Sequence, residues 1–372
     1  MSKTLCHFLI VALLCGGMAA RGADVPAKFL GAASCASSGC HGGGGEHQNQ
    51  FLAWSLKDFH SQRPVATLTT ARSKQIGEAL GIKDPTADAR CTTCHAPLQD
   101  VSADLRGDNF KVGEGVSCES CHGPSENWLR AHTRHDYTRA DRTAAGMRDL
   151  QNLYVRANTC VACHQVVSQP LSKAGHPELI FELDGQSVAE PKHWSAEKNG
   201  NGAQAWFVGQ AVALREMSWQ LDQAHAFEAG ASFSGTNLVA GCYAVAWLLH
   251  AATADNADVA KHSDDFAALQ QWADTLASEK AAAWSDQLTQ DCLTRLANTS
   301  ASFPDSKIPQ PVQARRAERL VLALDRLLAA QNNHKADAEL NQLFKLAQSV
   351  PDFDPAQFAA ALEKFATALS AP

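Results

Sequence analysis

Two short motifs of the same pattern carry the residues best suited to chemistry. They are Cys91–His95 (CTTCH) and Cys118–His122 (CESCH), each with two cysteines three positions apart and a histidine directly after the second. Two thiols about one helical turn apart can form thioethers with the two vinyl groups on one edge of a porphyrin, and the adjacent imidazole can then bind its iron. The spacing therefore predicts covalent attachment of a c-type haem at each motif.

The pattern recurs at two more places. Cys160–His164 (CVACH) is a regular copy, and Cys35–His41 (CASSGCH) has four residues between the thiols, where Ser-Ser-Gly can loop out. Redox dithiols and zinc sites also use Cys-x-x-Cys, but neither requires a histidine directly after it. We therefore expect four haem c groups. The attaching cysteines are Cys35, Cys40, Cys91, Cys94, Cys118, Cys121, Cys160 and Cys163, and the proximal iron ligands are His41, His95, His122 and His164.

A candidate for a ligand on the opposite, distal face of an iron follows the first motif. Residues 51–60 are expected to form a helix, because Phe51, Trp54 and Phe59 lie near one face at helical spacing. His60 ends this segment, and the aromatic face could lie against a porphyrin. We predict that His60 is a distal ligand; the alternative is an ordinary surface histidine.

At this point the chain resembles the cytochrome c554 family of multihaem cytochromes. The stretches that carry the resemblance are Phe29–Gly31, Trp54 with His60 six residues later, Cys91–His95 and Gly115–Pro124. The resemblance extends over residues 29–220. It implies several c-type haems in close-packed pairs that pass electrons, most irons having two axial histidines and one haem in some members keeping an open position. The wide spacing of the first motif departs from the family pattern.

The resemblance implies a further distal ligand within Trp128–His135, which we expect to be helical. We prefer His132 to His135, and both could instead be solvated beside neighbouring arginines. Four irons need four distal ligands, so full coordination by two histidines is feasible, but one open iron is not excluded. The spare histidines between residues 42 and 200 are His47, His60, His132, His135, His176 and His193.

Two more distal ligands are expected after the fourth motif. His176 precedes Pro177, which can open a helix and hold the residue before it in a non-helical conformation. His193 lies beside Trp194. Both stretches are similar to those of tetrahaem relatives in the same family, so we predict that His176 and His193 are iron ligands. The alternative for each is a solvated loop histidine.

The first 23 residues have the pattern of a secretory signal peptide. Lys3 supplies the positive charge, Leu5–Leu14 is mostly apolar, and small residues follow. The apolar run is short for a membrane span, and a retained anchor is the alternative. Export agrees with covalent haem attachment, which takes place on the outer side of the membrane. We therefore expect a periplasmic or otherwise exported protein.

The charge of the chain limits its partners. Removal of Lys3 and Arg21 with the signal peptide changes the formal net charge from −7 to −9, and haem propionates would add negative charge. Nucleic acid and anionic membranes are therefore poor partners, and redox proteins with a basic or neutral surface are better ones. Cys242 and Cys292 lie outside the motifs, and the sequence leaves open whether they form a disulfide.

The composition changes after Asn201, where alanine, leucine and charged residues at helical spacing predict a bundle. We expect domains over residues 24–200 and 201–372, after the signal peptide 1–23. Residues 238–254 lack charge and are expected to be a buried bundle helix rather than a membrane span. Cys242 is either a remnant of a lost haem motif or a core cysteine, and Arg315–Arg319 is expected to be a solvated helix face. The expected helices are 206–228, 237–253, 258–279, 282–298, 312–332, 335–348 and 355–370.

These observations predict a mainly α fold. A haem-organised multihaem cytochrome c domain of short helices and loops should precede an α-helical bundle. Without haem, the first of these parts should be largely unfolded, because four apolar porphyrins replace most of its side-chain core. We expect an exported tetrahaem cytochrome that transfers single electrons between redox proteins. The alternatives are an oxidoreductase acting on a small nitrogen or sulfur species at a five-coordinate haem, and a haem-based sensor or docking subunit.

Overall fold

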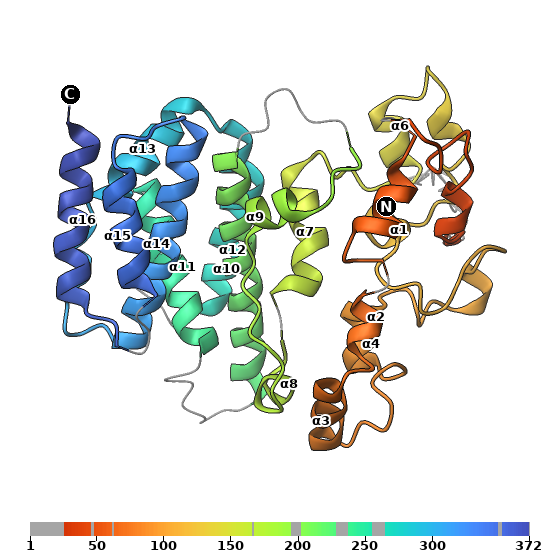
Figure 1. Cartoon of the computed structure of the whole chain (residues 1–372), viewed down its shortest axis with the longest axis horizontal. Coiled ribbons are helices and arrows are strands. Elements are labelled where there is room, and N and C mark those ends of the chain that lie inside the picture. The colour runs from red at the N-terminus through yellow and green to blue at the C-terminus, as the bar shows by residue number, and fades with distance from the viewer. Residues whose placement is uncertain are drawn as a thin grey trace, which may run out of the picture.

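The chain is mainly helical in its computed structural model, as expected. Short helices and loops form the part that carries the haem motifs, and long helices running side by side form the bundle (Figure 1). Within the described residues the only β-type pairing is an isolated bridge between Phe29 and Arg106. The described residues are 26–45, 48–61, 63–165, 167–194, 202–227, 237–254, 265–348 and 352–371, so residues 1–23, which were expected to be a signal peptide, and His47 lie outside them.

The haem-motif part is built from short elements, most of them one to three turns long. Three of these helices, α4, α5 and α7, end on the histidine of a motif. The elements are η1 Ala32–Cys35, α1 Gln50–Lys57, α2 Arg63–Thr67, α3 Ala71–Leu80, α4 Ala89–His95, η2 Ala103–Leu105, α5 Cys118–His122, η3 Ala131–Thr133, α6 Arg139–Ala144, α7 Leu153–His164, α8 Gln169–Lys173 and α9 Leu183–Ala189.

This part has almost no side-chain core of its own. Within its described residues from 26 to 150, eight apolar side chains are buried, and several of them are small. So small a buried apolar area cannot offset the conformational entropy of more than a hundred residues. The buried side chains are Ala32, Cys35, Ala53, Leu68, Ile76, Ile82, Ala96 and Trp128.

The bundle has a continuous apolar core. Helix α10 packs against α11, α12 and α14, and α16 packs against α13 and α15. Fully buried aromatic side chains, among them Trp206, Phe303 and Phe358, fill the space between them. The helices are α10 Gly202–Phe227, α11 Asn237–Thr253, α12 Phe266–Thr275, α13 Asp286–Ala297, α14 Gln310–Ala330, α15 Asp337–Ala347 and α16 Pro355–Ser370. Helix α12 continues through π-helical and 3-10 turns to Ala283.

The expected bundle helices agree closely with these ranges, apart from the start of the third, which falls on residues 255–264 outside the described chain. The charge-free segment is α11, which is buried among the other helices. Within the described residues no helix is both long and apolar enough to cross a membrane. Cys242 and Val245 are fully buried in the core, and Cys242 and Cys292 are both free thiols.

The bundle core also takes in side chains that precede residue 200. Ala157 and Val161 of α7 belong to it, and so do Phe181 and Leu183, which are 0 % exposed. Helices α7 and α9 both pack against α10 (Figure 1). The fourth haem motif and the segment after it are therefore attached directly to the bundle.

Three local predictions are wrong. Trp128–His135 forms turns and the short 3-10 helix η3 rather than an α-helix. Pro177 does not open a helix, because residues 176–182 are non-helical and α9 begins only at Leu183. Arg315–Arg319 is not simply a solvated face, since Arg319 is 7 % exposed and pairs with Glu182.

Candidate haem sites

The regular motifs lie on helices whose starts are capped by neighbouring polar side chains. Asp88 accepts the backbone N–H of Arg90 at the start of α4, the Ser120 hydroxyl accepts the backbone N–H of Ser117 at the start of α5, and Asn152 caps α7. These caps satisfy N–H groups that a short helix leaves unpaired. On each helix the two motif cysteines are three residues apart, one turn along the same side, and the histidine follows at the carboxyl end.

The wide first motif is closed by tight turns rather than by a regular helix. The N–H of His41 donates to the carbonyl of Cys35 at 3.1 Å, and the N–H groups of Cys40 and Gly42 both donate to the carbonyl of Ser37. A Cβ on Gly42 would lie 1.9 Å from the carbonyl oxygen of Ala36, so only glycine fits at this position. The extra residues therefore loop out and return Cys40 and His41 to the side of Cys35.

The thiols of different motifs meet in two pairs. Cys35 contacts Cys118, and this contact lowers the pKa of Cys35 and raises that of Cys118. Cys94 contacts Cys163 in the same way, which lowers the pKa of Cys94 to about 7. The first motif is thus next to the third, and the second is next to the fourth.

Two of the motif histidines lie beside a predicted distal histidine. The ring centroids of His41 and His132 are 6.0 Å apart with planes inclined by 17°, and those of His60 and His164 are also 6.0 Å apart with planes at 87°. Bonds of about 2 Å from opposite imidazole nitrogens to one metal place the ring centroids roughly 6 Å apart. His135 is exposed and takes no part.

Burial and the charges of other histidines lower the pKa of the two other motif imidazoles. Burial, and to a smaller extent the charge of His176, lowers the pKa of His95. The pKa of His122 is lowered to about 4, mainly by burial and next by His193. Both motif imidazoles are therefore neutral at pH 7, the form in which imidazole binds a metal.

Most of these imidazoles are oriented through Nδ1, which leaves Nε2 for the metal. Histidines that ligate metals usually donate their second ring N–H to a carbonyl or carboxylate, which fixes the orientation of the ring. The Nδ1 partners, with distances, are Gln50 Oε1 for His41 (2.8 Å), Asp58 Oδ1 for His60 (3.1 Å), the carbonyl of Pro64 for His95 (2.8 Å), that of Trp128 for His132 (3.2 Å), that of Pro177 for His176 (2.8 Å) and that of Pro191 for His193 (3.2 Å).

Comparisons with known proteins give independent information about these sites. A family model described as cytochrome c554 and c-prime matches residues 34–123, which hold the first three motifs and His60. This part of the chain belongs to the cytochrome c554 family. A search of curated proteins and a search of solved structures gave no match.

The match over residues 34–123 supports a c-type cytochrome, with covalently bound haem and a part in electron transfer. The resemblance expected over residues 29–220 is confirmed for residues 34–123, and beyond them it stays a prediction. The match does not fix the number of haems, so four haems stay a prediction, as do the ligands.

Two buried polar atoms test whether the cytochrome fits a haem at the third and fourth motifs. Nδ1 of His122 is buried and has no hydrogen-bond partner, and neither has Oε1 of Gln186. The Nε2 atom of Gln186 faces His164 Nδ1 at 3.2 Å. Turning this amide by 180° places the orphaned oxygen where Nδ1–H can donate to it, as a metal-bound histidine requires. The residues at the fourth motif thus fit the group that the family implies.

Glu119, between the thiols of the third motif, was not predicted as a functional residue. It is 1 % exposed and accepts the backbone N–H groups of Leu30 (2.9 Å), Gly31 (2.7 Å) and Ser125 (2.8 Å). This carboxylate ties the segment that leads into the first motif to the third. The two stretches that meet here, Phe29–Gly31 and Gly115–Pro124, both carry the resemblance to the family. Their joint occurrence was the only signal in the sequence that could have pointed to Glu119.

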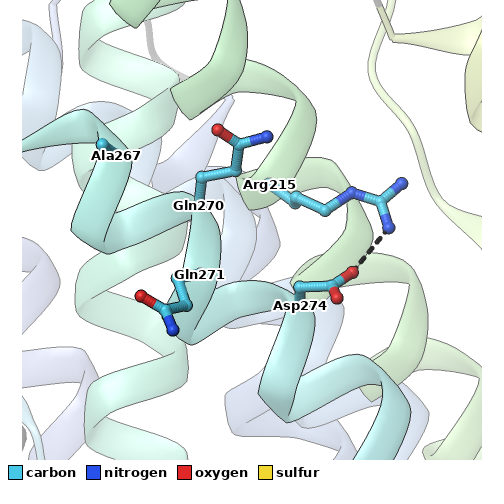
Figure 2. Close-up of a pocket in the computed structure, with 5 residues that line it drawn as sticks. All are labelled: Arg215, Ala267, Gln270, Gln271 and Asp274. Atoms are coloured by element: carbon cyan, nitrogen blue, oxygen red, sulfur yellow. Dashed lines mark hydrogen bonds and ion pairs between the residues drawn. The ribbon is translucent and has the colours of Figure 1, made fainter. Parts of the chain in front are cut away.

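A surface pocket of about 420 Å³ lies on the bundle rather than at the motifs (Figure 2). Its lining includes the ion pair between Arg215 of α10 and Asp274 of α12, at 2.8 Å. Both residues hydrogen-bond Tyr154, and Arg215 also contacts Asn158. Since Tyr154 and Asn158 belong to α7, the polar cluster helps to fasten the fourth motif helix to the bundle.

Proposed function

We propose that this protein is an exported tetrahaem c-type cytochrome that carries single electrons between redox proteins. Each iron would have two axial histidines, in the pairs His41 with His132, His60 with His164, His95 with His176, and His122 with His193. A haem held in this way supplies a reversible one-electron couple whose potential depends on its ligands and burial.

The observation that carries the proposal is the 6.0 Å separation between the ring centroids of His41 and His132 and between those of His60 and His164. For His95 and His122, the partners His176 and His193 are part of the proposal. An iron with both axial positions filled has no vacant site for a substrate. Electron transfer is therefore better supported than chemistry on a small nitrogen or sulfur species.

The thiol contacts support the same function. Because motif one touches motif three and motif two touches motif four, the attached porphyrin edges would lie close together within each pair. Thioether bonds hold each porphyrin permanently, so the distances between irons would stay fixed. A chain with this layout takes up an electron at one haem and passes it to the next without moving.

Mass spectrometry and electron paramagnetic resonance of the exported product test the proposal. We expect a mass equal to the chain without residues 1–23 plus four haems, and low-spin ferric signals alone. A high-spin iron that shifts on addition of nitrite or nitric oxide would support the enzyme instead. A mass without haem would refute both functions.

A further inference from the structure

The segment from residue 176 to residue 193, called the distal segment below, would serve three of the four proposed haem sites. It begins with His176 and ends with His193, the proposed distal partners of His95 and His122. Between them, Gln186 of α9 faces His164. The segment contains only one short helix of seven residues, so its own local structure cannot hold these three side chains in place.

Three arginines on α14 hold the distal segment by ion pairs. Arg315 contacts Glu178 at 2.6 Å. Arg319 contacts Glu182, and Arg326 contacts Asp184. The arginines are separated by four and seven residues, so they lie along one face of the helix. Their partners follow one another along the segment in the same order.

The pairs of Arg319 and Arg326 each include a buried partner. Arg319 is 7 % exposed and Asp184 is 6 % exposed. Glu182 also accepts a hydrogen bond from Gln210 of α10 at 2.9 Å. Breaking a buried ion pair leaves an uncompensated charge, so such pairs hold their partners firmly.

Apolar contacts fix the same segment against α10. Phe181 and Leu183 are fully buried in the bundle core. At Gly209 of α10 a Cβ would lie 2.8 Å from Cβ of Leu183 and 3.1 Å from its backbone nitrogen. The absence of a side chain at Gly209 therefore allows the segment to lie directly on the helix.

We propose that the C-terminal bundle is the platform that positions the distal ligands, with Arg319 and Arg326 as positioning residues. Thioether bonds fasten the proximal side of each haem to its own motif, but the distal histidine has no such attachment. The bundle replaces this missing attachment, because it holds the distal segment in one place. This proposal rests on the proposed function, since it assumes that His176 and His193 bind iron.

The test uses the complete haem-loaded protein and records its ferric spin state by electron paramagnetic resonance. Asp184→Asn keeps the shape of the side chain and removes its charge, and Arg326→Ala removes the partner. We expect each variant to convert up to two of the four haems to high spin, and added imidazole to restore the low-spin spectrum. Arg326→Lys keeps the charge and should remain nearer to the parent spectrum.

A matched control separates positioning from general loss of stability. Arg316→Ala removes another half-buried arginine of the same helix, one that lies over the ring of Trp247. It should lower the melting temperature of the bundle and leave all haems low-spin. If the buried pair proves too damaging for haem loading, Glu178→Gln at the more exposed pair gives the same readout with a smaller high-spin fraction.

His176→Ala and His193→Ala are the reference variants, each expected to give one high-spin haem that imidazole converts. If they do so while the Asp184, Arg326 and Glu178 variants all stay low-spin, the platform proposal is overturned and the proposed function stands. If the two histidine variants leave the spectrum unchanged, the histidines are not ligands, and both proposals fall.

Discussion

Replacing Glu119 by glutamine should loosen the connection between the first and third motifs. The carboxylate accepts three backbone N–H groups at 2.7 to 2.9 Å while being 1 % exposed. In glutamine one acceptor oxygen becomes an NH₂ group. At Gly31 a donor would then face a donor, and the charge that strengthens the other two bonds is lost. Losing one buried charge-assisted bond and leaving its donor unpaired costs about 2–4 kcal/mol.

The measurement is unfolding of the haem-loaded protein in guanidinium, followed by circular dichroism in the Soret band. Glu126→Gln is the matched control, because exposed Glu126 accepts only the N–H of Lys28, at 2.8 Å, in the same pair of segments. Glu126→Gln should lower the free energy of unfolding by less than about 0.5 kcal/mol. Equal midpoints for the Glu119 and Glu126 variants would refute the idea that Glu119 holds the two motifs together.

Three further predictions concern ligation, the haem-free chain and pH. His132→Ala should give one high-spin haem in electron paramagnetic resonance, while His135→Ala should give none; the reverse result would exchange their roles. Haem-free protein should lose residues 26–150 to limited proteolysis and keep a folded bundle, and equal resistance of both parts would contradict this. Burial raises the pKa of Asp274, but hydrogen bonds from Arg215 and Tyr154 lower it by more, so that the pKa lies below the usual 3.8. Ionised Asp274 therefore stabilises the folded protein above about pH 4, and this stabilisation is lost as pH falls through the pKa of Asp274 in the folded state. Asp274→Asn should flatten the acid side of the curve of melting temperature against pH, and an unaltered curve would argue against the pair.

The sequence predicted what depends on local pattern. The helices of the bundle follow from apolar residues at helical spacing, and six of the seven expected ranges end within two residues of the observed helix. The motif thiols and histidines follow from a fixed covalent chemistry. One error concerns Pro177, which permits a helix to start but does not impose one. The chain after Pro177 is non-helical up to Leu183, and this path places Phe181 and Leu183 in the bundle core.

What the sequence could not give is the pairing of residues that are distant along the chain. His41 and His132 are 91 positions apart, and no spacing rule links them. The orienting contacts are equally hidden, since His95 bonds a backbone carbonyl 31 residues away. Arg319 was expected to be solvated because its partner Glu182 lies 137 residues upstream, outside any helical period.

The packing of α7 into the bundle core has a consequence for how the protein matures. Ala157 and Val161 are buried there, and Cys160 packs partly against the same core. A ligation enzyme must reach Cys160 and Cys163, so the fourth porphyrin has to be attached before the bundle closes over this helix. In the proposed exported protein the order of the chain favours that sequence of events, because the motifs would cross the membrane ahead of the helices that cover one of them.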